Sequence, residues 1–227
     1  IRVKGDRYGR FKELKKEAKA KAKAQGILCM NNLKQVGLAV TMYADDNQGS
    51  VPPNFQGDGT GAGGSGWIRG KMDWTTKPAN TNIQFLVDAK IGPYTRSIGI
   101  YKCPADKYLS APQRARGWSG RVRSISMNAY IEGGAYKADK VSKGQPTEGS
   151  IWFPDYHFYD KFSDVVKPGP SEVWMMADEH PDSINDGWMI TSVNPDSWTD
   201  LPASYHGGAG GFNFVDGHSE IRAWKEA

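Results

Sequence analysis

The chain has 227 residues, with 38% apolar and 24% charged side chains, 27 glycines, 13 prolines and a formal net charge of +4. This length fits one domain, or one domain with an extension, and the many glycines and prolines indicate a structure rich in turns and loops. The sequence contains no run of about 18 apolar residues and no visible signal peptide, which excludes a transmembrane helix within the printed chain.

The positive charge is concentrated near the N-terminal end, in a run rich in lysine and alanine. Such a run could contact nucleic acid or anionic lipid, but alanine and lysine also favour a solvated helix. No nucleic-acid-binding motif accompanies the run, so we expect a solvated helix and no nucleic-acid partner. The lysines that form it are Lys12, Lys15, Lys16, Lys19, Lys21 and Lys23.

Residues 10–46 are predicted to form one long helix. After Gly26 the apolar residues recur close to the helical period, which predicts that this half packs on a core. Before Gly26 only Phe11 and Leu14 are strongly apolar, so the first half is expected to project. The polar residues 45–49 and the prolines that follow are predicted to end the helix. The periodic residues are Ile27, Met30, Leu33, Val36, Gly37, Val40 and Tyr43.

Beyond the helix we expect loops, one short helix and short strands. The glycine-rich segment 57–66 is predicted to be a plain loop, because it lacks the Gly-Lys-Ser/Thr ending of a phosphate-binding loop. The short helix is predicted over residues 81–89. No helical pattern separates the later strands, so we expect an antiparallel sheet and an α+β fold. The predicted strands cover residues 124–131, 172–177, 188–193, 211–215 and 219–224.

Near the C-terminus, His206 is followed by nine residues and then Asp216-Gly217. The Asp-Gly pair predicts a two-residue hairpin turn with positive φ at both positions. We expect His206 to fix a loop through hydrogen bonds. A metal-dependent hydrolase built on His180, His206, His218 and Asp216 is the alternative, but the chain has neither an HxH nor an HExxH pair. We therefore assign no catalytic residue and expect the protein not to be an enzyme.

The segment 178–187 is rich in side chains with oxygen atoms on a turn. Calcium takes about six to eight oxygen ligands, including backbone carbonyls, so this segment is the candidate calcium site. The alternative is a loop whose side chains cap their own backbone in Asx-turns. The candidate ligands are Asp178, Glu179, Asp182, Asn185 and Asp186.

Cys29 and Cys103 are the only cysteines. They form no CxxC pair and show no zinc-type spacing with paired histidines, which argues against zinc. They are candidates for one disulfide if the protein matures outside the cytosol, and two buried free thiols are the alternative.

The segment 152–159 is unusually aromatic and lacks the alternation of a strand. It is either a surface that stacks on glycans or contacts a partner, or a loop that packs over the sheet. The candidate surface residues are Trp152, Phe153, Tyr156, Phe158 and Tyr159.

Several segments, in order from Ala18 to Trp224, together resemble one known family. Residues 29–39 resemble its post-membrane helix, residues 101–106 its Cys-Pro-x-Asp element, and residues 124–128 its Ser-x-Asn strand. Residues 178–187 resemble its late acidic loop, and residues 206–217 its terminal signature. The chain thus resembles the prepilin-type His-x9-Asp-Gly family of type II secretion pseudopilin-like proteins.

The resemblance implies a pilin-like fold, with one long N-terminal helix packed on an antiparallel sheet with long loops. It implies a structural subunit that self-associates into a type II secretion or type IV-pilus-like filament, with other pseudopilins or secretion-system components as partners. It also implies export in a diderm bacterium to the inner membrane and periplasm or the cell surface, with a membrane anchor before assembly. Major pseudopilins carry calcium in a C-terminal loop, which supports the calcium expectation. The alternative function is a surface-displayed module that binds polysaccharide or another macromolecule on a pilin scaffold.

The start of the chain departs from this family. The family's Phe-Thr-Leu-Ile-Glu start and apolar helix are absent, and the charged residues 1–17 stand in their place. A lysine at the bilayer centre costs about 3 kcal/mol on insertion scales, so this segment is not expected to anchor the protein. We expect residues 1–17 to be an extension that replaces the anchor, and residues 18–227 to form the pilin-like domain.

Overall fold

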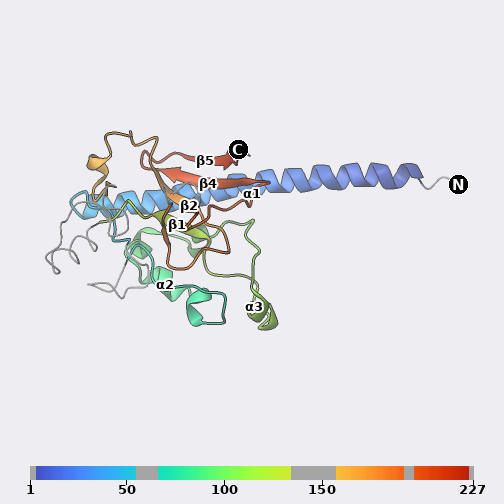
Figure 1. Cartoon of the computed structure of the whole chain (residues 1–227), viewed down its shortest axis with the longest axis horizontal. Helices are drawn as coiled ribbons and strands as arrows, with labels where there is room; N and C mark the ends of the chain where they lie inside the picture. The colour runs from blue at the N-terminus through green and yellow to red at the C-terminus, as the bar shows by residue number, and fades with distance from the viewer. Residues whose placement is uncertain (1–3, 55–65, 134–156, 192–196, 225–227) are drawn as a thin grey trace.

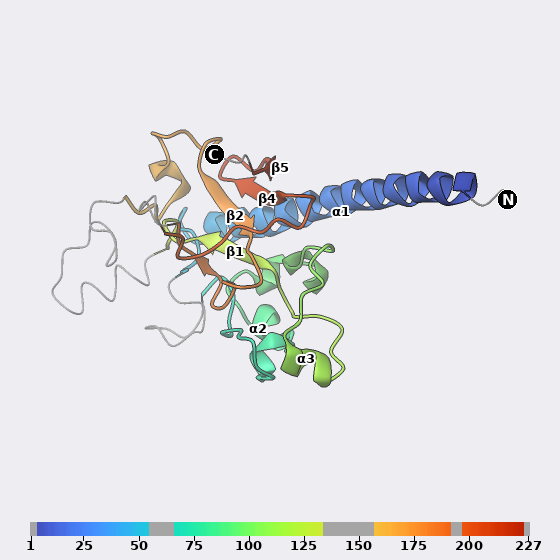
Figure 2. The same cartoon turned by 45° about the vertical axis from the view of Figure 1, so that its right-hand side comes forward.

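The computed structural model describes residues 4–54, 66–133, 157–191 and 197–224 (Figure 1). One long helix, α1 (Lys4–Asp46), runs across the whole molecule, and its first half extends away from the rest of the chain. Short helices α2 (Gln84–Val87) and α3 (Ala111–Ala115) lie on the β1 side, away from β4 and β5, in both views (Figure 2). Four 3-10 turns complete the helical elements of the described residues: Pro78–Asn80, Gly92–Tyr94, Ile98–Tyr101 and Phe162–Asp164.

The two halves of α1 differ in the way the sequence predicts. Residues 9–21 are all exposed, whereas a buried stripe with helical spacing begins near Gly26. The stripe packs in the main core through Cys29, Leu33, Val36 and Val40, each with 0% exposure. The helix begins at Lys4, six residues before the predicted start, although the added residues include Gly5 and Gly9, which have low helix propensity.

The helix ends at Asp46, as predicted. Two left-handed residues follow it, Gln48 with φ 59° and Gly49 with φ 81°. The backbone N–H of Gly49 donates to the carbonyl of Ala44 at 2.8 Å, which satisfies one of the carbonyls that a helix end leaves open. Within the described ranges, no helix combines the length and the apolar character that crossing a bilayer requires.

The strands form one five-stranded sheet in the order β3-β1-β2-β4-β5. The pairs β1–β2, β2–β4 and β4–β5 are antiparallel, and β3 pairs parallel with β1. The α+β class and the helix packed on a sheet are therefore confirmed. The bounds are Ile125–Asn128 for β1, Trp174–Asp178 for β2, Trp188–Met189 for β3, Ala209–Phe214 for β4 and Ser219–Ala223 for β5.

The expectation of a purely antiparallel sheet is wrong at β3. Both edges of β2 are occupied, by β1 and by β4, so the chain that leaves β2 finds its next free edge on β1. It reverses direction in the loop 179–187 and therefore runs parallel to β1 when it pairs there. The sheet is mixed, and β3 is shorter than the predicted strand, whose last two residues lie outside the described chain.

The C-terminal hairpin has a longer turn than the sequence indicates. The N–H of Gly217 donates to the carbonyl of Phe214, and the N–H of Phe214 donates to the carbonyl of His218, each at 2.9 Å. Of the turn residues only Gly217 has positive φ, at 88°. The connection is thus a three-residue loop with a glycine bulge, and the expected positive φ at Asp216 is wrong.

Helix α1 packs mainly on β4, on the 3-10 turn Ile98–Tyr101 and on β5, and glycine permits a close approach to β4 at two places. A Cβ atom at Gly37 of the helix would lie 2.1 Å from the side-chain oxygen of Asn213 in β4. A Cβ atom at Gly211 of β4 would lie 2.6 Å from Leu33 of the helix. The sheet and the helix therefore meet without room for even one more methyl group at either place.

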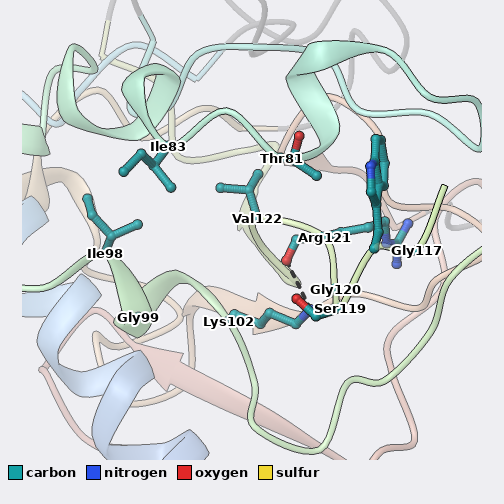
Figure 3. Close-up of a pocket in the computed structure, with 11 residues that line it drawn as sticks. Thr81, Ile83, Ile98, Gly99, Lys102, Gly117, Ser119, Gly120, Arg121 and Val122 are labelled. Carbon is teal, nitrogen blue, oxygen red and sulfur yellow. Dashed lines mark hydrogen bonds between the residues drawn. The ribbon is translucent and has the colours of Figure 1, made fainter. Parts of the chain in front are cut away.

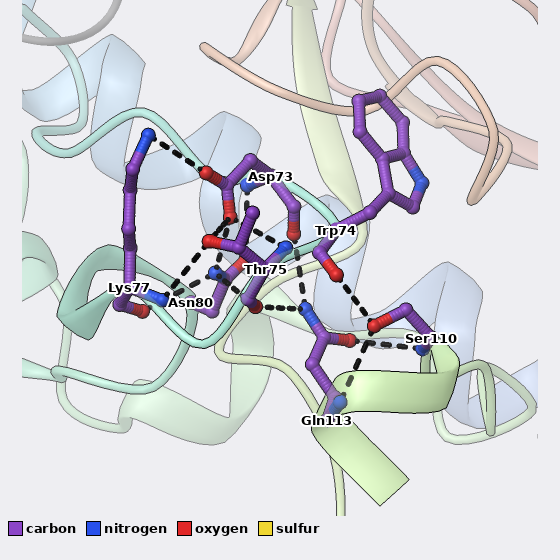
Figure 4. A network of polar contacts seen from close by, with 7 residues as sticks. All are labelled: Asp73, Trp74, Thr75, Lys77, Asn80, Ser110 and Gln113. Atoms are coloured by element: carbon purple, nitrogen blue, oxygen red, sulfur yellow. Dashed lines mark hydrogen bonds and ion pairs between the residues drawn. The ribbon is translucent and has the colours of Figure 1, made fainter.

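A polar network holds the loops around α3 (Figure 4). The carboxylate of Asp73 accepts hydrogen bonds from the N–H of Thr75 at 2.9 Å and from the amide of Asn80 at 3.0 Å. Burial raises the pKa of Asp73, but these hydrogen bonds outweigh burial and hold the pKa below its usual range. The amide of Gln113 donates to the carbonyls of Asp73 and Thr75 at 3.0 and 2.9 Å. Trp74, Lys77 and Ser110 complete the network.

Candidate functional site

Four side chains with metal-ligand or acid–base chemistry meet where α1 crosses the sheet: Cys29, Cys103, Asp178 and His206. We call them the junction cluster. Their ligand atoms all lie within 4.8 Å of one another. Cys29 Sγ donates to Asp178 Oδ2 at 2.9 Å, and Cys103 Sγ lies 3.4 Å from His206 Nε2. The same nitrogen lies 3.6 Å from Asp178 Oδ2.

Each member of the junction cluster is positioned by its own element. Cys29 lies on the buried stripe of α1, and Asp178 is the last residue of β2. Cys103 is fixed through its backbone N–H, which donates to Ser124 Oγ at 2.7 Å. His206 precedes β4, and its backbone N–H donates to the carbonyl of Ala209 at 3.1 Å, across two glycines with positive φ.

The junction cluster is closed to solvent. Cys29, Cys103 and Asp178 are 0% exposed, and the His206 side chain is 4% exposed. The hydrogen bond between the two cysteines raises the pKa of Cys29 and lowers the pKa of Cys103. The hydrogen bonds to Asp178 and then to Cys103 raise the pKa of His206. The geometry therefore favours negative charge on Cys103 and positive charge on His206.

This arrangement is not that of a nucleophile–histidine–acid triad. In a triad the acid and the nucleophile contact opposite nitrogens of the imidazole ring. Here Nε2 of His206 faces both Cys103 and Asp178, and Nδ1 has no hydrogen-bond partner among the described residues. Full burial also leaves no room for a substrate beside Cys103.

A second buried polar group lies next to the junction cluster, around Glu179. Burial, followed by the charge of Asp200, raises the pKa of Glu179 to about 8. Burial lowers the pKa of Arg123 to about 10, and the charges of Glu179 and Asp186 oppose that shift. The guanidinium of Arg123 donates to the carbonyl of Asn185 at 2.6 Å. This group ties β1 to the loop that follows β2.

Replacing Asp200 by asparagine is expected to remove part of the pH dependence of stability. Burial raises the pKa of Asp200 from 3.8 to about 6, so the folded state binds more protons than the unfolded state between these values. Stability contributed by this group is present at low pH and falls as pH rises through that window, by up to about 1.4 kcal/mol per pKa unit. Asparagine keeps the acceptor for the Ile190 N–H, which lies 2.8 Å from Asp200 Oδ2.

The measurement is the melting temperature of wild type and Asp200→Asn across the acid range, with Asp182→Asn as the exposed control. Asp182 has a side-chain exposure of 64%. We expect Asp200→Asn to have a higher melting temperature than wild type near neutral pH, and we expect the difference between the two melting temperatures to shrink toward acid pH. A difference that stays constant with pH, or an equal effect of Asp182→Asn, would contradict the assignment.

The five candidate calcium ligands do not converge on one point in the described structure. Asp178 joins the junction cluster, and Glu179 is buried, with 1% exposure. Asp182 is exposed beside His180, at 3.6 Å. The remaining two cap their own loop: Asn185 Oδ1 accepts from the N–H of Asp186, and Asp186 Oδ1 accepts from the N–H of Trp188. Calcium binding in this segment stays a prediction.

The histidines of the hydrolase alternative are dispersed. His180 pairs with Asp182, and His218 pairs with Asp216 at the hairpin turn, where its ring stacks on Phe214. Only His206 lies in the junction cluster. The role of His206 as a residue that fixes a loop stays a prediction, and its side chain has partners that the sequence did not suggest.

Three of the aromatic surface candidates, Trp152, Phe153 and Tyr156, lie outside the described residues. Phe158 packs on Tyr130 with ring centroids 5.9 Å apart. Tyr159 is buried, with 9% exposure, and belongs to the main core. Of the two described members, Tyr159 therefore packs inward, and Phe158 is partly buried against Tyr130.

A separate surface cavity of about 510 Å³ lies beside the 3-10 turn Ile98–Tyr101 (Figure 3). The ammonium of Lys102 donates to the carbonyl of Arg121 at 2.9 Å and lies 3.7 Å from Asp106. None of the eleven residues drawn around the cavity is a histidine, cysteine, aspartate or glutamate. Its lining therefore offers no acid–base pair.

Cys29 and Cys103 are brought together, as the disulfide prediction requires, and both are free thiols in this structure. Their pairing stays a prediction. The sequence singled out Asp178 as a candidate calcium ligand and His206 as a loop-fixing residue, but it did not indicate that they join the cysteines, since Cys29 and Asp178 are 149 residues apart and Cys103 and His206 are 103 residues apart. No local spacing signals such a group, and only the fold assembles it.

Comparison with known proteins gives one result. The model of a family described as "Protein of unknown function (DUF1559)" matches residues 18–167, which is well over half of the chain. No curated protein and no solved structure matches. The matched region begins where the predicted domain begins and contains α1 from Ala18, both cysteines and β1. The chain therefore belongs to the DUF1559 family, which is associated with type II secretion pseudopilin-like proteins.

Proposed function

We propose that this protein is a structural subunit of a type II secretion or type IV-pilus-like filament, and that it acts by self-association and not by catalysis. The observation that carries the proposal is an apolar stripe on the outer side of α1, opposite the side that packs on the sheet. Family membership supports it, and so do the order and spacing of the His-x9-Asp-Gly signature.

The outer stripe consists of four large apolar side chains, each of which is 44–58% exposed. At about 100° per residue they fall within an arc of about 100° on the helix, and Cys29, Leu33, Val36 and Val40 occupy the opposite arc. The stripe has two parts, Ile27 with Leu28 and Leu38 with Met42, and the exposed polar residues Asn31 and Gln35 lie between them on the same face. Large apolar side chains exposed together on one face of a helix favour an interaction surface. The members of the outer stripe are Ile27, Leu28, Leu38 and Met42.

A shallow cavity of about 470 Å³ lies beside this stripe, between α1 and the β4–β5 turn. Leu38 and Thr41 line it from the helix, and Val215 and His218 line it from the turn. The stripe and the cavity give a neighbouring copy both an apolar contact and a place to insert a side chain.

The projecting half of α1 adds a second contact region. Phe11 and Leu14 are 53% and 54% exposed, and they continue the line of the buried stripe beyond the point where the sheet ends. Side chains that the domain itself leaves uncovered along this line favour a partner that lies alongside the helix. A second copy of the chain supplies such a partner, because its own α1 has the same length and the same two stripes.

The proposal includes export to the inner membrane and periplasm or the surface of a diderm bacterium, with other pseudopilins or secretion-system components as partners. It also includes membership of the prepilin-type His-x9-Asp-Gly group. The location with its partners and the membership of this group both depend on the filament hypothesis, so they need no separate test.

The proposal is tested by acidic substitution of the outer stripe in the full-length gene product, produced in its own bacterium. We expect Leu38→Glu with Met42→Glu to abolish filaments that an antibody to this chain labels in electron microscopy, because two carboxylates cannot be buried cheaply in a subunit contact. The matched control is Ile83→Glu, since Ile83 is 54% exposed and lies outside α1. Equal protein amounts on an immunoblot, with unchanged filaments in the stripe variant, would refute the role of the stripe.

A further inference from the structure

The junction cluster contains four potential metal ligands, and packing of α1 on the sheet does not require them. Two thiols, one carboxylate and one imidazole converge in the core, all from different segments of the chain. We propose that Cys29, Cys103, Asp178 and His206 bind one zinc ion in a closed structural site. This goes beyond the filament function and does not depend on it.

The distances fit a tetrahedral ion. With Zn–S near 2.3 Å and Zn–N or Zn–O near 2.0–2.2 Å, neighbouring ligand atoms of a tetrahedral site are about 3.3–3.8 Å apart. The contact between Cys103 Sγ and His206 Nε2 is 3.4 Å, and that between His206 Nε2 and Asp178 Oδ2 is 3.6 Å. The contact between Cys29 Sγ and Asp178 Oδ2 is 2.9 Å and has to open to about 3.5 Å when the ion replaces the thiol proton.

The ligand types select zinc over calcium and magnesium. Thiolates and imidazole prefer zinc and related transition metals, whereas hard cations require oxygen ligands. Two thiolates and one carboxylate carry three negative charges in a site with no exposure at Cys29, Cys103 or Asp178. A divalent cation offsets most of that charge, which would otherwise be costly to bury.

Backbone groups around the junction cluster orient its side chains. The backbone N–H of Gly211 donates to Asp178 Oδ2 at 3.2 Å, and the backbone of Ala105 contributes a hydrogen bond to Cys103. A Cβ atom at Gly211 would lie 2.8 Å from that carboxylate oxygen and 3.3 Å from Cys29 Sγ. Glycine at this position therefore keeps open the space in which the four ligands meet.

A disulfide accounts for only half of the junction cluster. It would join Cys29 and Cys103 and leave the carboxylate of Asp178 and the imidazole of His206 buried beside it. Zinc uses all four groups, and it explains why Nε2 of His206 faces two other ligand atoms at once. The fourth position is filled by protein, which assigns the ion a structural role and not a catalytic one.

The experiment measures zinc bound to the full chain, purified under reducing conditions and dialysed against zinc, by inductively coupled plasma mass spectrometry. We expect one zinc per chain, and cobalt in its place to give the intense visible bands and thiolate charge-transfer bands of a tetrahedral site. Zinc content should fall close to zero in Cys103→Ser and His206→Gln. It should be unchanged in His218→Gln, whose histidine is 42% exposed at the hairpin turn.

A measurement on the wild-type protein does not depend on whether the variants fold. A chelator should lower the melting temperature of the wild-type protein, and added zinc should restore it. A reduced, folded wild-type protein that takes up neither zinc nor cobalt would overturn the proposal. So would protein from its native compartment that carries a Cys29–Cys103 disulfide and no metal. Filament formation is not part of either readout, so the two proposals can fail separately.

Discussion

Replacing Leu33 by alanine is expected to lower the free energy of unfolding by about 2–5 kcal/mol, the range for removing a fully buried leucine side chain. Leu33 is 0% exposed in the main core and lies directly over Gly211 of β4. Removing its side chain leaves a cavity between α1 and the sheet, next to Cys29, that the rigid backbone of both elements cannot close. Urea denaturation monitored by tryptophan fluorescence measures the effect.

The control for this prediction is Leu38→Ala on the same helix. Leu38 is 58% exposed, so its removal changes the free energy of unfolding by less than about 0.5 kcal/mol. The pair separates the buried side of α1 from the outer stripe with the same chemical change. Similar effects of the two substitutions would show that the helix does not dock on the sheet as described.

Replacing Gly37 by alanine is expected to destabilise the protein by about 1–3 kcal/mol, as overpacking of a filled core does. The new methyl group would lie 2.1 Å from Asn213 Oδ1 and 2.7 Å from its Cγ. Asn213 cannot turn away freely, because its amide donates to the carbonyl of His218 at 3.0 Å and to Ser219 Oγ at 3.1 Å. Thermal and urea unfolding measure the loss.

The helix propensity of alanine works in the opposite direction, by about 1 kcal/mol relative to glycine. The control is therefore Gly9→Ala in the projecting half of α1, where an added methyl group would meet no atom within 4 Å beyond the local helix backbone. We expect Gly9→Ala to raise the helix signal in circular dichroism without loss of stability. If Gly37→Ala stabilises the protein as much as Gly9→Ala does, the close contact between α1 and β4 is wrong.

The sequence alone predicts those elements that are determined by residues close together in the chain. The helix end at Asp46 follows from a run of polar residues and two prolines, and the buried stripe follows from the 3.6-residue period. The hairpin of β4 and β5 follows from alternation around Asp216-Gly217. The parallel pairing of β3 does not follow, because it depends on which sheet edge remains free after the other strands have paired.

The candidate site was predictable only in part, for a related reason. Cys29 is periodic with the core positions of α1, and Cys103 belongs to a recognisable Cys-Pro element, so their proximity could be expected. Asp178 was expected among oxygen ligands because it precedes an acidic loop, yet as the last residue of β2 its side chain turns to Cys29. Strand direction and helix crossing decide that contact, and neither is encoded in residue spacing.

The central claim, that this protein is a filament subunit, is tested most directly on the bacterium that makes the chain, by identifying the protein components of its filaments. Filaments sheared from intact cells are examined by immunogold electron microscopy with an antibody to this chain, and their protein content is determined by mass spectrometry. If the protein is a filament subunit, the antibody labels the filaments regularly along their length and this chain is among their components. Filaments that are unlabelled and lack the chain, while the cells contain it in quantity, would contradict the proposal that it is a filament subunit.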